Sequence, residues 1–573
     1  MKNRFHFFVQ AVLSGALLAG CQTWPQPEEN TPVILCFNGY EAPATKTAFG
    51  GKDGTGRYPV LWSDTDQTAV TLNGAAAFQT ASIVPSDDAR SCTFQTSWVL
   101  PAAPFEVQAV SPASAVASFD GAGGVGLHIP AVQAPSAGSP DALAQLLVAE
   151  TTIDAVPDGN IPLQFHHATA YGCLSLTNLP TAATVRSVDI IASVPLSGKW
   201  NYDFSTRALA ADVPANIITL QTAETSRLFF GCAPANLQGQ SLKIRLNTDA
   251  GVFERNVSIS APLSFKAGTV ANFTVDMSSA EQKKSISILG IGNSFTMDAM
   301  QYLWQPLRES GYTEIVLAYL YEGGCSLQRH VTKFNGDVSY TYYKNTSGSW
   351  GSSNATIPVA LAEREWDYIT LQQVSGYSGV ASSYDPYLAQ LIDAVRGGRP
   401  SSKLFWHMTW AYQANSSHGD FAKYGRDQMT MYNAIISCVD SEVVPTRAFG
   451  GLIPCGTAIQ NLRSSYFGDA LTRDGYHLSL REGRFLAALM WCRVLGGIPL
   501  ADNGFTPSAY NYTDWDLLAI KDAAETAFAT PLTITQSTYV TSEPPEPSSS
   551  GSHAEDFVFD GHSRGEHFVM EAE

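Results

Sequence analysis

Residues 285–296 read Ser-Ile-Ser-Ile-Leu-Gly-Ile-Gly-Asn-Ser-Phe-Thr, and this stretch decides the fold of the region around it. Its first part alternates and then runs apolar, which is typical of a short buried strand. Gly290 and Gly292 indicate a sharp exit, and helical sequence follows from Met297. A serine on such a turn presents its hydroxyl at the carboxyl edge of the sheet, where open α/β folds bind ligands. By itself the pattern also fits an ordinary turn in which Ser294 is only an N-cap.

A second motif much later in the chain favours a chemical role for this serine. Residues 472–479 read Thr-Arg-Asp-Gly-Tyr-His-Leu-Ser, so Asp474 and His477 stand three apart just before a helix. A nucleophilic serine needs a general base, and that base needs a partner that fixes its tautomer. Ser294, Asp474 and His477 are therefore the candidate catalytic residues.

Composition limits the classes of protein that the chain can represent. Its 573 residues predict several domains, and 45% hydrophobic content is ample for packed cores. Charged residues make up 15% and the net charge is −18, which argues against nucleic acid as a partner because nucleic acid requires basic patches.

The first residues predict export. Lys2 and Arg4 precede an apolar stretch, residues 7–20, that is too short to span a bilayer comfortably. It ends in Leu-Ala-Gly before Cys21, which resembles the lipobox of bacterial lipoproteins. This predicts a signal peptide over residues 1–20, lipidation of Cys21, a tether over residues 21–30, and a place in the cell envelope, at the outer membrane or cell surface. The alternative is an ordinary signal peptide.

Neither the cysteines nor the histidines predict a metal site. Eight further cysteines are scattered without any Cys-x-x-Cys pair, so they form neither a zinc framework nor a dense disulfide scaffold. His166 and His167 are adjacent in a predicted strand and therefore point to opposite faces. We expect no metal and no cofactor.

The chain then divides into two regions of different texture. Residues 31–278 show short alternating runs separated by Gly, Pro, Asn and Asp, which predicts an all-β region of one β-sandwich or two small ones. After a linker near residues 278–284, strands alternate with helices. This predicts a three-layer α/β/α domain with a mostly parallel sheet over residues 284–535.

Individual elements of the α/β region are also expected. The expected strands are 314–319, 366–373 and 403–408, and the expected helices are 387–395, 428–439, a helix from Ser479 with a capping box to Glu482, and 514–528.

The end of the chain is rich in Ser, Glu and Pro. Residues 536–573 are expected to form a tail that is disordered from about residue 540. It contains a Gly-x-Ser-x-Gly motif at residues 561–565, which we set aside because a nucleophile elbow needs a strand before it and a helix after it.

The all-β region resembles the fimbrillin-like domains of Bacteroidota surface lipoproteins. The stretches that carry the resemblance are 61–66, 163–176 and 263–268. It implies a domain that displays, assembles or binds, without catalysis of its own.

Residues 284–502 resemble the SGNH (GDSL-like) hydrolases, and in particular a bacterial branch catalogued as a domain of unknown function, DUF4886-like. Gly-Asn-Ser-Phe at 292–295 stands where that family has Gly-Asp-Ser and its nucleophile. Residues 323–327 stand where it has an oxyanion-hole glycine, which implies this role for Gly324. Residues 371–375 stand where it has Gly-x-Asn-Asp, and Asp474 with His477 matches its closing Asp-x-x-His.

Two departures from the family pattern matter. Asn293 replaces the usual Asp, which is not a triad member. No Gly-x-Asn-Asp is present, so Gln373, with Gln372 as the alternative, is expected to supply the oxyanion amide. His407 could face the same cleft or be a buried core residue, and Trp410 and Tyr412 could stack on a sugar ring or serve only packing.

These features support two hypotheses. The first is a lipid-anchored envelope protein with serine esterase activity, a carbohydrate esterase or deacetylase acting on an acylated glycan or glycopeptide. The alternative is a surface adhesin or fimbria-related protein whose α/β region binds glycan without hydrolysing it. The missing third block favours the alternative.

The lipobox gives the first testable prediction. Cys21→Ala should release the protein from the membrane fraction, because the lipid and not a helix holds it there. Fractionation of cells that express the variant checks this. A variant that still sediments with membranes in high salt would show that the lipobox interpretation is wrong.

Overall fold

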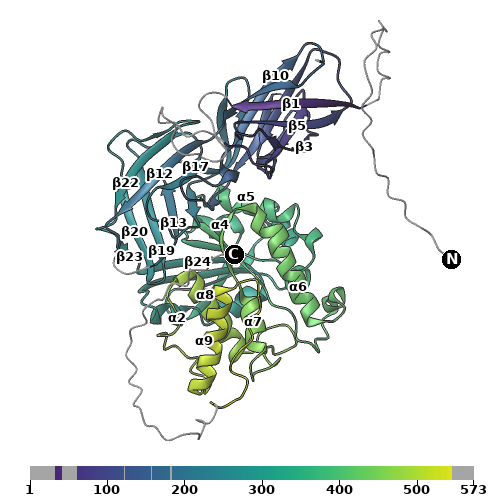
Figure 1. Ribbon diagram of the computed structural model, residues 1–573. Helices are drawn as coiled ribbons and strands as arrows, with labels where there is room; N and C mark the ends of the chain where they lie inside the picture. The colour runs from purple at the N-terminus through teal and green to yellow at the C-terminus, as the bar shows by residue number, and fades with distance from the viewer. Residues whose placement is uncertain (1–31, 42–60, 122, 157, 181–183, 545–573) are drawn as a thin grey trace, which may run out of the picture.

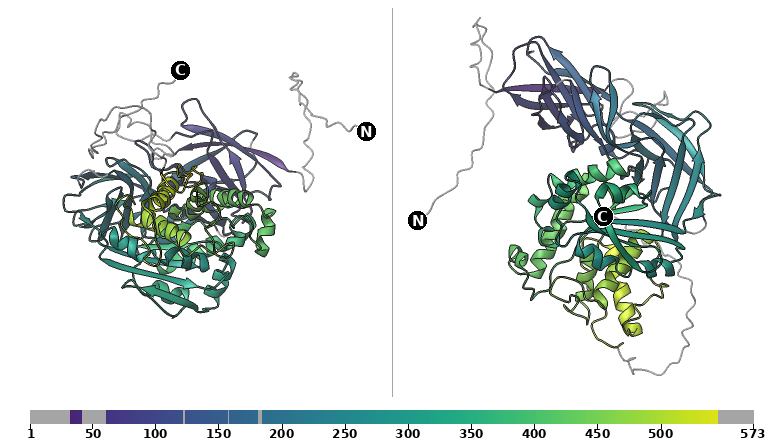
Figure 2. Two further views of the ribbon diagram at one scale, coloured as in Figure 1. Left: turned by 90° about the horizontal axis from the view of Figure 1, so that it is seen from below. Right: turned by 180° about the vertical axis from the view of Figure 1, so that it is seen from behind.

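The computed structural model describes residues 32–41, 61–121, 123–156, 158–180 and 184–544. An all-β part, residues 33–282, precedes a part that combines a sheet with helices, residues 285–529 (Figures 1 and 2). The expected signal peptide, Cys21, the tether and the motif at 561–565 lie outside the described residues. Within those residues, no helix is long and apolar enough to cross a membrane.

The all-β part is built from several sheets, as the alternating pattern predicted. Its strands are β1 (Val33–Glu41), β2 (Gln67–Leu72), β3 (Gln79–Ser82), β4 (Val84–Pro85), β5 (Ser91–Trp98), β6 (Phe105–Ser111), β7 (Val116–Phe119), β8 (Gly124–Ile129), β9 (Val132–Gln133), β10 (Leu147–Ile153), β11 (Ile161–His167), β12 (Ala170–Thr177), β13 (Val185–Ala192), β14 (Ser197–Asp203), β15 (Ala208–Ala215), β16 (Ile217–Leu220), β17 (Leu228–Cys232), β18 (Ala235–Asn236), β19 (Ser241–Thr248), β20 (Gly251–Ser258), β21 (Ser264–Phe265), β22 (Val270–Asp276) and β23 (Glu281–Gln282).

The strands pack around separate cores. The first sheet has the order β3-β2-β6-β10-β11-β1-β5-β4 and buries a cluster that includes Phe37 and Phe165. A later six-stranded sheet, β23-β20-β19-β13-β16-β9, and a three-stranded sheet, β17-β12-β22, share another cluster that includes Ile190 and Phe230. The prediction of a large N-terminal all-β region is confirmed.

The second part is organised on one mixed sheet with the order β27-β26-β25-β24-β28-β29-β30. Its strands are β24 (Ser285–Gly292), β25 (Glu314–Tyr321), β26 (Tyr340–Asn345), β27 (Trp350–Ala355), β28 (Tyr368–Leu371), β29 (Lys403–His407) and β30 (Phe449–Ile453). Five neighbouring strands, β25, β24, β28, β29 and β30, run parallel. Strands β26 and β27 add an antiparallel hairpin at one edge. The hairpin was not predicted from the sequence.

The helices of this part form two groups by their contacts. The helices are α1 (Ser294–Met300), α2 (Trp304–Glu309), α3 (Leu327–Asn335), α4 (Ile357–Ala362), α5 (Tyr387–Gly398), α6 (Gln428–Cys438), α7 (Cys455–Arg463), α8 (Glu482–Gly496) and α9 (Asp514–Ala529). One group consists of α1, α2, α7 and α9, which all contact α8 or one another. The other group consists of α3 and α4, which both contact α5.

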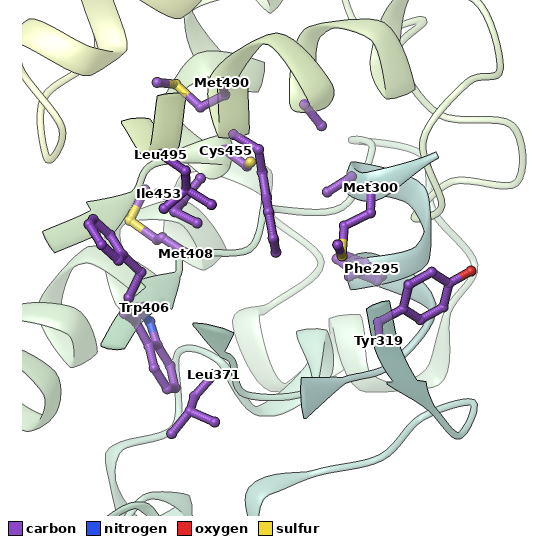
Figure 3. Packing of buried hydrophobic residues seen from close by; sticks show 14 of the residues in the cluster. Phe295, Met300, Tyr319, Leu371, Trp406, Met408, Ile453, Cys455, Met490 and Leu495 are labelled. Carbon is purple, nitrogen blue, oxygen red and sulfur yellow. The ribbon is translucent and has the colours of Figure 1, made fainter. Parts of the chain in front are cut away.

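Helix α8 is the centre of the first group. It is apolar on nearly every side, and its residues 485–493 are all buried, as expected for a helix surrounded by protein. Met490 and Leu495 of α8 belong to the same core as Phe295 of α1 and Trp406 of β29 (Figure 3). The core therefore holds the helix that begins at Ser294 against the sheet.

Two expected boundaries differ from the structure. Helix α8 begins at Glu482 and not at Ser479. The Ser479 N–H is bonded to Leu471 O, and the Ser479 hydroxyl accepts from Gly483 N at 2.9 Å. The chain also stays bonded to the α/β part beyond residue 535, since Ser537 N donates to Ser464 Oγ and Trp515 Nε1 donates to Thr541 O.

The expected linker is part of the structure. Residues 281–282 form β23, which pairs with β20, and Lys283 N donates to Val252 O at 2.8 Å. The two parts are thus connected by an ordered segment that extends a sheet of the all-β part.

Buried charges join the two parts. Lys403 of β29 and Asp189 of β13 form an ion pair of 2.8 Å in which both side chains are almost completely buried. Arg245 of β19 is also buried and pairs with Asp367, which precedes β28, at 3.3 Å. Burial on its own would raise the pKa of Asp189, but Lys403 and Arg245 outweigh it and hold that pKa below its ordinary value.

This interface predicts a specific stability pattern. Asp189→Asn should lower the free energy of unfolding by about 3–5 kcal/mol, because it leaves the buried Lys403 ammonium without a counter-charge. Adding Lys403→Met should recover most of that loss. Lys199→Met, which breaks the half-exposed interface pair with Asp393, is the control and should cost about 0–1 kcal/mol.

Denaturant titration of the full chain measures these values. Equal losses for Asp189→Asn and Lys199→Met would contradict the importance of the buried pair.

Candidate active site

The turn after β24 is held by Asn293. Asn293 is the N-cap of α1, and its Oδ1 accepts a hydrogen bond from Phe295 N at 3.0 Å. The capping role that a simple turn would give to Ser294 therefore belongs to its neighbour, and the Ser294 hydroxyl is left for another contact. Gly292 is required here, since a Cβ at this position would come within 2.0 Å of Thr296 Oγ1.

The loop that carries Asp474 and His477 is equally constrained. Thr472 and Leu478 form an isolated β-bridge, and Arg473 N donates to His477 O at 2.9 Å. Between them Gly475 has φ +90°, a backbone conformation that L side chains rarely adopt. The result is a tight loop that turns both functional side chains to the same side.

The structure brings the three candidate catalytic residues together. The Ser294 Oγ lies 2.9 Å from His477 Nε2, and His477 Nδ1 lies 2.7 Å from Asp474 Oδ2. An ionised carboxylate only accepts, so Nδ1 carries the ring proton and Nε2 is free to accept the serine proton. This is the connectivity of a serine nucleophile, a base and an orienting acid.

Asp474 is held in its ionised form. Its Oδ1 also accepts from the N–H groups of His477, at 2.8 Å, and Tyr476, at 3.2 Å. Partial burial on its own would raise the pKa of the carboxyl, but the hydrogen bonds from the His477 ring and backbone outweigh it, so the pKa lies below its ordinary value.

Two main-chain donors are available beside the serine. The Ser294 N–H is at the first position of α1, where no intrahelical acceptor exists. Gly324, with φ +68°, follows β25, whose last residue pairs with Gly292, and Asn293 Nδ2 donates to Cys325 O at 3.0 Å. Within the described residues neither the Ser294 nor the Gly324 N–H has an acceptor.

Gln373 is not the oxyanion donor that sequence analysis expected. Its Nε2 donates to the main-chain oxygen and the hydroxyl of Ser383, both at 3.0 Å, and its Oε1 accepts from Leu327 N and Val374 N. Both hydrogens of the amide are thus used to join the start of α3 to the segment after β28. Its role is structural.

The alternative, Gln372, is also committed to the protein. Its Nε2 donates to Asn293 Oδ1 at 2.8 Å, while its Oε1 accepts from Thr296 Oγ1 at 2.5 Å and from His407 Nδ1 at 2.8 Å. The side chain connects the ends of β24, β28 and β29.

His407 and Trp410 do not line a cleft. His407 is buried, and burial lowers its pKa to about 3, so the ring is neutral. Trp410 is completely buried, stacks on Phe295 with ring centroids 4.1 Å apart and donates its Nε1 to Tyr476 O at 2.8 Å. It supports the site from within, and neither residue can stack on a sugar. Tyr412 is likewise completely buried.

Two residues near the triad were not predicted from the sequence. Tyr476 is partly exposed, and its ring centroid lies 4.1 Å from that of His477. Asp298, four residues after Ser294, contacts the Asp474–His477 loop through Arg473 and Leu478 N. The spacing of Asp298 from Ser294 was a usable signal, because residues four apart share a helix face.

No metal cluster is found in the described part of the chain: no three His, Cys, Asp or Glu side chains there are placed to hold an ion.

The C-terminal part is thus a mixed α/β domain that carries a Ser–His–Asp arrangement at one edge of its sheet. The family model described as domain of unknown function DUF4886 matches residues 287–527. A DUF4886 family protein from Bacteroides uniformis is 36% identical over 45% of this chain and 100% of that chain, with a TM-score of 0.43. The chain belongs to the DUF4886 family.

Two other solved structures that are similar to this chain are putative cell adhesion proteins. A putative cell adhesion protein from Bacteroides ovatus is 9% identical, covering 44% of this chain and 97% of that chain, with a TM-score of 0.29. Another from Bacteroides uniformis is 14% identical, covering 43% and 96%, also with a TM-score of 0.29. A search of the curated proteins finds no match.

The hydrogen bonds of Asn293 explain why Asn and not Asp stands before the serine. Asn293→Asp should lower the free energy of unfolding by about 1–3 kcal/mol, because a buried carboxylate oxygen would replace the donor that now bonds Cys325 O. Denaturant titration measures the effect.

Asn345→Asp is the matched control. Asn345 is also buried, but its Oδ1 accepts from Ser347 N and Gly348 N, and a carboxylate keeps both bonds. Equal stability of wild type and Asn293→Asp would show that the amide donor is unimportant.

Proposed function

We propose that this protein is an envelope serine hydrolase that cleaves esters with Ser294, His477 and Asp474. The observation that carries the proposal is the chain of two hydrogen bonds, 2.9 Å from Ser294 Oγ to His477 Nε2 and 2.7 Å from His477 Nδ1 to Asp474 Oδ2. The helix groups on the sheet and the Gly-Asn-Ser and Asp-x-x-His motifs support an SGNH-like three-layer arrangement.

The residues define the steps of the reaction. The Ser294 oxygen attacks the ester carbonyl while its proton moves to His477 Nε2, and Asp474 stabilises the imidazolium that forms. The carbonyl oxygen becomes an oxyanion that accepts from the Ser294 and Gly324 N–H groups. Collapse expels the alcohol, which takes the proton from Nε2. Water then attacks the acyl-serine with the same base, releases the acid and restores Ser294.

The substrate class follows from the proposed location. A lipidated Cys21 would hold the protein at the outer membrane or cell surface, where acylated glycans and glycopeptides are accessible. We therefore propose a carbohydrate esterase or deacetylase acting on such an acyl group.

One observation favours a second candidate, a surface adhesin or fimbria-related protein that binds glycan without hydrolysis. The amide of Gln373, in the block where SGNH enzymes have their side-chain oxyanion donor, is fully bonded to Ser383. The oxyanion would then rest on main-chain donors alone. In this candidate the large all-β part would provide the binding surface.

Substitution of the triad separates the two candidates. Ser294→Ala and His477→Ala should each lower kcat on a chromogenic acetyl ester by about 10,000-fold, and the double variant should lose little more, because the residues act as a unit. Asp474→Asn should be similarly severe, since an amide can stabilise the wrong imidazole tautomer.

The control is Ser205→Ala, which changes an exposed serine of the all-β part. A wild-type rate no higher than that of Ser294→Ala, with glycan binding retained in both, would contradict the esterase and support the adhesin.

A further inference from the structure

A buried carboxylate lies one helical turn below the candidate nucleophile. Asp298 stands four residues after Ser294 on α1, so the two side chains share a face of the helix. Its side chain is completely buried. A buried carboxylate is costly unless cations and N–H groups satisfy it, so its partners show what it holds.

Those partners come from the loop of the base and from α8. The Oδ2 of Asp298 accepts from Leu478 N at 2.9 Å. Arg473 Nη1 lies 3.1 Å from each carboxylate oxygen. Arg484 of α8 adds its Nε at 2.8 Å and its Nη2 at 2.7 Å to Oδ1.

The loop contacts bracket the acid and the base. Arg473 directly precedes Asp474, and Leu478 directly follows His477. The Arg473 guanidinium also donates to Leu478 O at 2.5 Å, and Arg473 N donates to His477 O. Asp298 therefore holds both sides of the loop at once.

We propose that Asp298 is a positioning residue that fixes His477 Nε2 at hydrogen-bonding distance from Ser294 Oγ. Asp298 and Ser294 belong to the same rigid helical turn. A loop that is hydrogen-bonded to Asp298 therefore keeps a fixed position relative to Ser294. Other anchors of the loop, such as Trp410 Nε1 to Tyr476 O, tie it to a different segment. The proposal rests on the proposed function and goes beyond it, since Asp298 touches no reacting atom.

The test compares Asp298→Ala with Asp298→Asn. Asp298→Ala removes every contact and should lower kcat on the acetyl ester about 100-fold with KM within about twofold, because small misplacement of a catalytic group costs rate and not binding. Asp298→Asn keeps an oxygen that can accept from Leu478 N and should regain part of the lost kcat.

Glu525→Gln is the matched control for stability. Glu525 of α9 pairs with Arg493 Nε at 2.7 Å. Arg493 is on α8, as Arg484 is, but lies about 13 Å from Arg484 along the helix axis. This variant should lower the unfolding temperature and leave kcat unchanged. If Asp298→Ala lowers the unfolding temperature with kcat also unchanged, positioning is refuted while the esterase stands.

Hydrogen exchange tests the positioning of the loop without any measurement of activity. Peptides that span residues 472–478 should exchange faster in Asp298→Ala than in wild type, with no such change in Glu525→Gln. Unchanged exchange would overturn the positioning role whether or not the protein hydrolyses esters. A wild-type rate equal to that of Ser294→Ala, with faster loop exchange in Asp298→Ala, would overturn the esterase and leave Asp298 as the anchor of the loop.

Discussion

The side chain of Asn293 is the interaction on which the candidate site depends. One amide caps α1 through Phe295 N, donates to Cys325 O behind the Gly324 turn and accepts from Gln372 after β28. Three strand ends are thereby fixed to each other at one edge of the sheet. The serine, its free N–H and the glycine turn keep their relative places because this group is buried and is hydrogen-bonded through both its oxygen and its nitrogen.

The arrangement around Asn293 extends to the opposite side of the serine. Asp298 continues the contact of α1 with the loop of Asp474 and His477, and α8 closes the group through Arg484. The nucleophile thus lies between two sets of hydrogen bonds that both begin on its own helix or its cap. Such support from neighbouring side chains is what a preorganised site requires.

Local patterns were enough to predict some features and not others. The strand, turn and helix at 285–300 and the Asp474–His477 pair follow from spacing within a few residues, so they could be found from sequence. Gln373 could not be assigned correctly, because its partners Leu327 and Ser383 are brought to it only by folding. For Trp410 the sequence left open whether it stacks on a sugar ring or packs in the core. Its stacking on Phe295, which is far away in sequence, places it in the core.

The buried Lys403–Asp189 pair has a consequence for how this chain can change during evolution. A charge that is shut away from water in one part is neutralised by a side chain of the other. An exchange of the all-β part for an unrelated one would succeed only if the incoming strand offered an acid at the same place, or if Lys403 were replaced at the same time. In this chain, the all-β part and the α/β part therefore constrain each other through a shared buried ion pair.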